Sequence, residues 1–254
     1  MRRMTSVLAM VLVGVGVAIG SAESATQVNV DGFGDAGNVV TGPTVVFGSY
    51  LFAGTLNLLT GGEIWRSSNG TSWAQVNTDG FGDAINFSTS PTVVFGGNLY
   101  ANTLNPLTGG EIWRSSNGTT WIQVNTDGFG DAKNTSASPG VVFADFLYSG
   151  TQNNVTGGEI WRSSNGTTWT QVSSGGFGDA NNVSTSPAVV FGGNLYAVSQ
   201  NLVTGGTIWR SSNGTSWTQV SSGGFGDANN RWIGARVLFQ GLLYAGTQND
   251  VSGV

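Results

Sequence analysis

The chain has 254 residues, including 41 Gly, no Cys and no His, and only 9% of its residues are charged. The absence of Cys and His excludes disulfides, thiol nucleophiles, imidazole bases and the common zinc ligands. Nine Lys and Arg against 14 Asp and Glu give a formal net charge of −5, which argues against nucleic-acid binding. With 39% hydrophobic residues and nine Trp, the chain is too apolar to be disordered.

The first 22 residues predict a secretory signal peptide. Arg2 and Arg3 precede an apolar run at residues 7–19, which small residues follow up to Ala22. This order is typical of a cleaved export signal, and the apolar run is shorter than a membrane-spanning helix of about 20 residues. We expect prokaryotic export to the outside or the cell surface, no membrane span in the mature chain, and one domain at residues 23–254. An uncleaved N-terminal anchor is the alternative.

A repeat of 48 residues dominates the remainder of the chain. The string GGEIWRSSNGTSW begins at Gly61, and close copies begin at Gly109, Gly157 and Gly205. The phrase GFGDA occurs five times at the same spacing. A period of this length indicates one supersecondary unit per repeat, stacked on its neighbours to bury a shared core.

Within one repeat, the pattern predicts four short strands. In the second copy they fall at residues 93–95, 99–103, 111–116 and 119–124. The dipeptide Asn117-Gly118 predicts a tight hairpin between the last two, and nothing shows helical periodicity. Four antiparallel strands in about 48 residues is typical of a propeller blade, whereas a β-helix uses shorter repeats. We therefore predict an all-β fold, a β-propeller of four-stranded antiparallel blades.

The two ends of the repeat array suggest at least five blades. Residues 26–30 match the fourth strand of a repeat, as ring closure by a terminal strand would require. The chain ends at Val254, where the third strand of the fifth copy should follow. We expect a C-terminal truncation of a longer product, with imperfect closure of the last blade as the alternative.

The segment at residues 67–73, Ser-Ser-Asn-Gly-Thr-Ser-Trp, resembles a shortened Asp-box (BNR-type) repeat. This resemblance implies a hairpin of the kind found in sialidase-like and other propellers. Here Asn69 replaces the usual Asp, and one residue before Gly70 is absent. A second similarity, to tachylectin-type lectin propellers, rests on Gly175-Gly176-Phe177 and on the later string LYAV.

The long loops are the predicted location of any site. Because strand direction alternates, the loop between the second and third strands and the connection between blades emerge on one face, and binding residues concentrate on such loops. Each connection carries an Asp followed three residues later by Asn, and oxygen ligands in a Gly-rich loop suggest calcium. The alternative is that these side chains bond their own backbone. The candidate calcium ligands are Asp35, Asp83, Asp131, Asp179 and Asp227.

A lectin-like site is the second candidate, because a Trp face can carry a sugar ring while Asn, Glu and Arg supply hydrogen bonds. The alternative is that the Trp side chains pack between blades. The candidate ligand-binding residues are Asn57, Glu63, Trp65, Arg66, Asn105, Glu111, Trp113, Arg114, Asn153, Glu159, Trp161, Arg162, Asn201, Trp209 and Arg210.

These observations favour a non-enzymatic function. Catalysis needs unlike groups with separated pKa values, whereas the candidate residues recur equivalently around the ring. We expect a multivalent binding module for glycans or a surface protein, acting through the long-loop face or inter-blade crevices. A structural surface scaffold is the alternative, and a degenerate sialidase-like glycosidase is a third interpretation. No cofactor is predicted apart from the candidate calcium.

Overall fold

Each 48-residue repeat folds into one antiparallel sheet. The computed structural model describes residues 27–42, 45–249 and 251. The first sheet contains β1 (Asn38–Thr41), β2 (Val45–Phe47), β3 (Tyr50–Asn57), β4 (Ile64–Ser67) and β5 (Ala74–Gln75). The second contains β6 (Ser88–Phe95), β7 (Asn98–Leu104), β8 (Ile112–Ser115) and β9 (Ile122–Gln123). The third contains β10 (Ser136–Phe143), β11 (Phe146–Gln152), β12 (Ile160–Ser163) and β13 (Thr170–Ser173). The fourth contains β14 (Asn182–Phe191), β15 (Asn194–Asn201), β16 (Ile208–Ser211) and β17 (Thr218–Gln219), and a fifth begins with β18 (Asn230–Phe239) and β19 (Leu242–Asn249).

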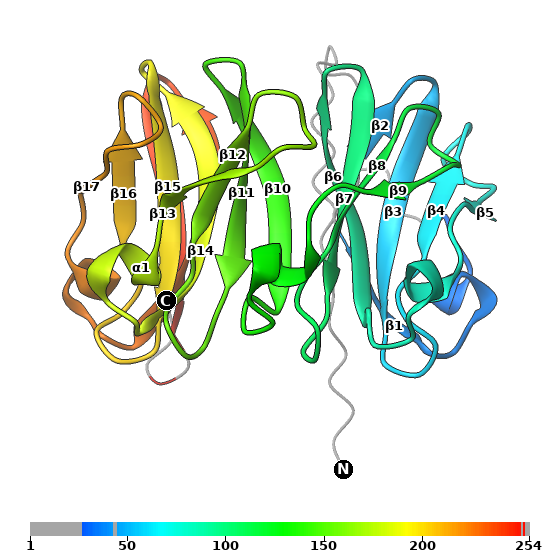
Figure 1. Cartoon of the computed structure of the whole chain (residues 1–254), viewed down its shortest axis with the longest axis horizontal. Coiled ribbons are helices and arrows are strands. Elements are labelled where there is room, and N and C mark those ends of the chain that lie inside the picture. Colours follow the sequence, from blue (N-terminus) through cyan, green and yellow to red (C-terminus); the bar gives the residue numbers. More distant parts are fainter. Residues whose placement is uncertain (1–26, 43–44, 250, 252–254) are drawn as a thin grey trace, which may run out of the picture.

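The sheets follow one another as the blades of a propeller (Figure 1). In that view the strands stand nearly upright, and the blades run from β2–β5 on the right to β15–β17 on the left. A single backbone pair links the second strand of each blade to the first strand of the next, at β3–β6, β7–β10, β11–β14 and β15–β18. The predicted all-β propeller is therefore confirmed; in the described residues the first blade has five strands, the next three have four each, and a fifth has two.

The strands differ from the prediction mainly in their lengths. The first strand of the second blade is β6, which starts at Ser88 instead of residue 93, because residues 88–91 also pair with β7. A register shift between Pro91 and Val93 interrupts this pairing, as expected where Pro supplies no N–H. The predicted boundary at residue 93 therefore marks this bulge and not the start of the strand.

The hairpin between β8 and β9 is wider than predicted. Asn117 Oδ1 accepts hydrogen bonds from the backbone N–H groups of Thr119 (2.9 Å) and Thr120 (2.8 Å). Ser115 Oγ accepts one from Gly118 N (2.7 Å). These side chains hold residues 116–121 in a loop, which shortens the fourth strand to two residues.

Each connection contains one helical turn that the sequence did not predict. These turns are η1 (Asp31–Gly34), η2 (Asp79–Gly82), η3 (Asp127–Gly130), α1 (Gly175–Gly178) and η4 (Gly223–Gly226). In η2, Gly80 and Phe81 both have positive φ, at 54° and 57°. A Phe in the left-handed region is costly, and the same conformation recurs in all five copies.

The hydrophobic core lies between neighbouring blades. Phe52 and Ile64 of the first blade pack with Leu99 and Ala101 of the second, and Trp121 joins them. Three similar clusters follow along the ring. Stacking of sheet faces thus buries the apolar surface that a single blade would leave exposed.

Two predictions concern the N-terminal residues. The predicted signal peptide at residues 1–22 lies outside the described residues, as does Thr26. Residues 27–30, expected in a fourth strand, contain no strand, since the described residues hold no third strand of the fifth blade with which they could pair. In the part of the chain that the structure describes, no helix has the length and apolar character needed to span a membrane.

Candidate functional site

One Asp and two Asn side chains tie together the two long loops of each blade. In the second blade, Asn105 Nδ2 donates to Asp83 Oδ2 and to Asn86 Oδ1, both at 3.0 Å. Asn105 Oδ1 accepts from the backbone N–H groups of Leu107 and Thr108. The network joins the connection that enters the blade to the loop that follows β7, so both loops lie at the same end of the sheet, as predicted.

A buried glutamate is anchored to this network. Glu111 is 7% exposed, and its Oε2 accepts hydrogen bonds from Asn86 Nδ2 (3.0 Å) and Trp113 Nε1 (2.6 Å). Among the described residues, Oε1 has no hydrogen-bond partner. The candidate residues Asn105, Glu111 and Trp113 are therefore brought into one cluster, with Asn86 at its centre.

The aromatic side chains of the cluster are stacked. The ring of Phe81 lies 4.2 Å from that of Trp113, at an interplanar angle of 7°. Phe81 also meets the edge of Trp121, at 5.7 Å and 66°. The positive φ of Phe81 aims its ring at the two indoles, which offsets part of the backbone strain.

The electrostatic setting of Glu111 is unusual. Burial is the main cause that raises the pKa of this carboxyl above its ordinary value of 4.5. The hydrogen bonds from Trp113 and Asn86 oppose the shift, while the nearby carboxylates of Asp127 and Asp83 add to it. Asp127 itself lies in η3, where its Oδ1 accepts a hydrogen bond from Gln123 Nε2 at 2.6 Å. Glu111 thus holds its proton to higher pH than a free carboxyl.

The copies of this cluster are not equivalent. The first three blades carry Glu63, Glu111 and Glu159, each bonded to an Asn and a Trp. The fourth blade has Thr207 at this position. The Asp beside the Glu is present in the first two blades, as Asp79 and Asp127, and replaced in the next two by Gly175 and Gly223. Only the first two blades therefore combine both carboxyl groups.

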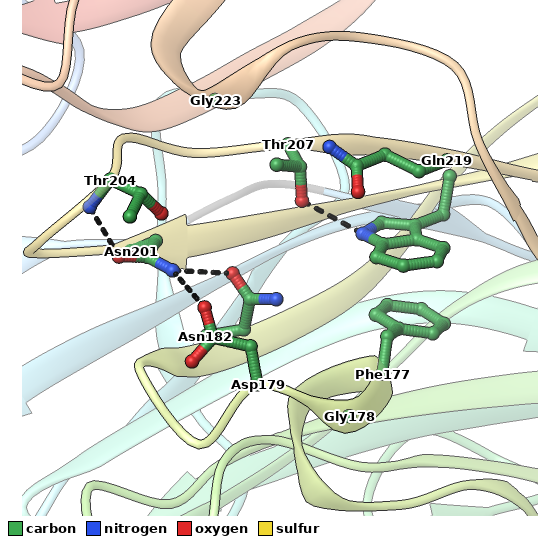
Figure 2. Close-up of a pocket in the computed structure, with 10 residues that line it drawn as sticks. Phe177, Gly178, Asp179, Asn182, Asn201, Thr204, Thr207, Gln219 and Gly223 are labelled. Atoms are coloured by element: carbon green, nitrogen blue, oxygen red, sulfur yellow. Dashed lines mark hydrogen bonds between the residues drawn. The ribbon is translucent and has the colours of Figure 1, made fainter.

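The fourth blade contains a cavity of about 420 Å³ at the same place (Figure 2). Thr207 Oγ1 accepts the hydrogen bond of the Trp209 indole at 2.8 Å, and Trp209 stacks on Phe177 at 4.3 Å. The remaining polar lining comes from Asp179, Asn182, Asn201, Thr204 and Gln219.

The candidate residues Arg66 and Arg162 lie on a different surface from the cluster of Glu and Trp side chains. The Arg66 guanidinium lies 4.5 Å from the Tyr50 ring centre, and that of Arg162 lies 4.3 Å from the Phe146 ring centre. Because neighbouring side chains of a strand point to opposite faces, these arginines do not join the Trp cluster. They line two outer crevices of about 530 and 450 Å³.

Arg114 and Arg210, the other two arginines of the candidate set, occupy equivalent positions on strands β8 and β16. Arg114 of β8 lies beside Tyr100, whose pKa is raised by burial and partly lowered again by this arginine. Arg210 of β16 is exposed. The predicted ligand-binding set is thus divided between two surfaces of each blade.

The five candidate calcium ligands all accept hydrogen bonds from the protein. Each Asp binds a backbone N–H two residues on with Oδ1, and an Asn Nδ2 from the neighbouring loop with Oδ2. Within the described residues, no three acidic side chains gather as a metal site would require. Calcium stays a prediction.

Sequence reasoning missed the central role of the second Asn. Asn86 was paired with Asp83 only as a calcium candidate, whereas it links Gly80, Asn105 and Glu111. It also missed Thr207 and Gln219, which line the cavity. The available signal was the break in the repeat at Thr207, where three other copies have Glu.

Comparison with known proteins supports the fold. No family model and no curated protein matches the chain. Among solved structures, a Trypanosoma rangeli sialidase in complex with sialic acid is 15% identical, with a TM-score of 0.53, over 83% of this chain and 42% of the sialidase. A Bacillus subtilis arabinanase is 13% identical, with a TM-score of 0.46, over 83% of this chain and 89% of that one. A Bacteroides ovatus glycosyl hydrolase is 11% identical, with a TM-score of 0.47, over 83% and 80%. The chain spans about two fifths of the sialidase, and its similarity to that structure, at 15% identity, supports the propeller fold alone.

These comparisons contradict two expectations from the sequence. The sialidase, whose TM-score exceeds 0.5, is a glycosidase, whereas we expected a non-enzymatic binding module or scaffold and no enzyme. The expectation assumed that the candidate residues are equivalent around the ring. The differences among Glu111, Glu159 and Thr207, and among Asp127, Gly175 and Gly223, remove that premise.

Proposed function

We propose that the protein hydrolyses glycosidic bonds of neutral saccharides, with Glu111 as general acid and Asp127 as the companion carboxylate. The observation that carries the proposal is the raised pKa of the buried Glu111 beside an acidic residue. A buried carboxyl group with a raised pKa next to a second carboxyl group is a usual arrangement for the general acid of glycosidases.

The hydrogen bonds of Glu111 support the role of acid. Oε2 accepts from both Asn86 and Trp113, so the proton of the neutral carboxyl resides on Oε1. That oxygen has no protein partner in the described residues and is free to protonate a leaving-group oxygen. Asp127 Oδ1 is held by Gln123, and its other oxygen is available to activate water or to stabilise positive charge on the sugar.

The charges near the cluster favour a neutral substrate. The carboxylates of Asp83 and Asp127 both raise the pKa of Glu111 and would repel an anionic sugar. Arg66 and Arg162 line other surfaces. The sialidase structure is described as a complex with sialic acid. Sialic acid is an anion, so we do not extend that substrate to this chain.

Hydrolysis of 4-nitrophenyl glycosides of arabinose, xylose, mannose and galactose tests the proposal. We expect Glu111→Gln to lower kcat by about 10²- to 10⁴-fold, the usual contribution of general acid catalysis, while retaining the hydrogen bonds to Asn86 and Trp113. The matched control is Glu159→Gln, because Glu159 makes the same contacts but has Gly175 in place of the companion Asp. We expect it to lose less than tenfold. No release of nitrophenol by the wild type, or equal losses in both variants, would refute the role of Glu111.

Two further features belong to this proposal. We infer that the hairpins between the third and fourth strands are shortened Asp boxes, because Asn117 Oδ1 accepts hydrogen bonds from two backbone N–H groups of the loop.

We also infer that residues 1–22 direct secretion, because their order matches an export signal. The remaining residues, 23–254, then form one domain. N-terminal sequencing of exported protein should then begin at Glu23, and retention of Met1 would contradict it.

A further inference from the structure

The cavity in the fourth blade results from one substitution in a buried network. Asn38, Asn86 and Asn134 each donate from Nδ2 to a backbone carbonyl and to a Glu Oε2. Their counterpart Asn182 is 3% exposed and donates to Gly176 O at 2.7 Å. In the described residues, no acceptor is present for its second amide hydrogen. Asn182 thus keeps a buried donor that the first three blades satisfy internally.

This donor is directed into the cavity. In Figure 2 the amide nitrogen of Asn182 points into the space between Thr207 and Phe177. The short Thr207 side chain replaces one function of the missing Glu, since it accepts from the Trp209 indole. Thr207 does not replace the second function, which is to accept a hydrogen bond from the Asn amide, because the other contact of its hydroxyl is to Ser199 Oγ. An oxygen from a ligand would complete the hydrogen bonding.

The third blade shows what occupies this space when Glu is present. Its lining matches that of the fourth blade residue for residue, apart from Glu159 in place of Thr207: Phe129, Gly130, Asp131, Asn134, Asn153, Thr156, Trp161, Gln171 and Gly175. Glu159 Oε2 there accepts from Asn134 (2.9 Å) and Trp161 (2.8 Å). The Glu carboxylate is therefore an internal occupant that the fourth blade lacks.

We propose that the fourth-blade cavity binds a neutral sugar residue, one oxygen of which accepts the free hydrogen bond of Asn182. The volume of about 420 Å³ lies at the small end of the range for ligand pockets and suits one sugar ring. Asp179 is the single charged residue in the lining, so an anionic ligand is disfavoured. Gln219 Nε2 is bound to Ser221 O (2.7 Å), which fixes the amide and leaves its oxygen to accept from a sugar hydroxyl.

This site is separate from the Glu111 cluster and goes beyond the proposed hydrolysis. It lies two blades away, and its lining contains one carboxyl group, so it would hold a saccharide without cleaving it. Failure of hydrolysis therefore leaves the binding proposal standing, and loss of binding leaves the assignment of Glu111 standing.

The test is titration calorimetry with methyl glycosides of mannose, galactose, xylose and N-acetylglucosamine. We expect Thr207→Glu, which restores the residue of the other three blades, to lower the binding stoichiometry by one molecule per chain. We expect Glu159→Thr, which recreates the fourth-blade lining in the third, to raise it by one. The fold of each variant is checked by its circular dichroism spectrum, and each substitution uses a residue that already occurs in an equivalent blade.

The location and charge preference are tested separately. The side-chain amide resonances of Asn182 should shift on addition of the bound glycoside in the wild type and in Glu111→Gln, and should not shift in Thr207→Glu. Methyl glucuronide should bind at least tenfold more weakly than the neutral glycosides. Absence of binding by every neutral glycoside, unchanged stoichiometry in both variants, or preference for the glucuronide would overturn the proposal.

Discussion

At the scale of single residues, one buried position gives each blade its chemical character. With Glu111 or Glu159 there, a carboxylate accepts hydrogen bonds from Asn and Trp and fills the space between the long loops. With Thr207 the space opens into a cavity. A repeat that is nearly uniform in sequence can thus carry different sites, because a buried donor must be satisfied by whichever acceptor is present.

The pKa of Glu111 makes a prediction about stability. Because its folded-state pKa is raised above 4.5, the folded state binds more protons than the unfolded state between 4.5 and the raised value. The associated stabilisation is complete below pH 4.5 and is lost as the pH rises through the folded pKa. Urea unfolding followed by Trp fluorescence should show this decline in the wild type as the pH is raised above 4.5. The decline should be smaller in Glu111→Gln, and an identical pH dependence in the two proteins would count against a raised pKa.

At the scale of elements, the hairpin between the third and fourth strands acts as a contact between blades. Gly166 of the third blade packs against the hydroxyl of Tyr100 in the second, and Gly214 packs likewise against Tyr148. The Trp169 indole donates to Val124 O of the preceding blade at 3.1 Å. The Asn-Gly dipeptide therefore serves both the turn and the packing against the preceding sheet.

This dual role predicts different costs for two chemically identical substitutions. Gly166 and Gly70 have similar positive φ angles of 74° and 79°, so Ala at either site incurs a backbone cost of about 1–2 kcal/mol. At Gly166 the added Cβ would also collide with Tyr100, whereas at Gly70 it meets no atom within 4 Å. We expect Gly166→Ala to lower the free energy of unfolding by about 1–3 kcal/mol more than Gly70→Ala, as overpacking does.

Chemical denaturation of both variants measures this difference. The double variant Gly166→Ala with Tyr100→Phe should recover part of the loss, because the Tyr100 hydroxyl is the nearest obstacle. Equal destabilisation at Gly70 and Gly166 would show that the hairpin does not act as an inter-blade contact.

At the scale of the whole molecule, the blades change in composition along the chain. The first two combine Glu and Asp, the third retains Glu159 alone, and the fourth has Thr207 and Gly223. The architecture is repeated, but the distribution of carboxyl groups is not. This asymmetry confines the Glu–Asp pair to the first two blades and places Thr207 in the fourth, in contrast to a ring of equivalent sites.

The candidate calcium ligands recur in all five copies, so metal removal is a test on the whole molecule. Each Asp already accepts hydrogen bonds with both oxygens, and we expect EDTA to leave the unfolding temperature unchanged. A single calcium site at 100 times its Kd would add about 2.7 kcal/mol, or roughly 5–10 °C for a domain of this size. A fall of that size on EDTA addition, reversed by calcium but not by magnesium, would establish a calcium site.

Much of the fold was predictable because its signals are local. The 48-residue period and the β-branched runs indicated four strands per blade, and the register of β6 with β7 and of β7 with β8 agrees with them. The helical turns were not predictable from periodicity, since each is a single turn. In η2 it is stabilised by Asn86 and by the stacking of Phe81 on Trp113. The width of the hairpin after β8 depended on the Asn117 side chain, which the simple Asn-Gly rule does not include.

The sequence by itself determined the repeat, the propeller architecture and the candidate residues, because strand patterning and turn chemistry act over a few neighbouring positions. Only the tertiary structure decided which candidates meet. It placed Trp113 with Glu111 and directed Arg114 to another surface, because alternate side chains of a strand face opposite ways. It also converted the isolated difference at Thr207 into a cavity with a free donor, because Asn182 and Thr207 are 25 residues apart and become neighbours only when the blade folds.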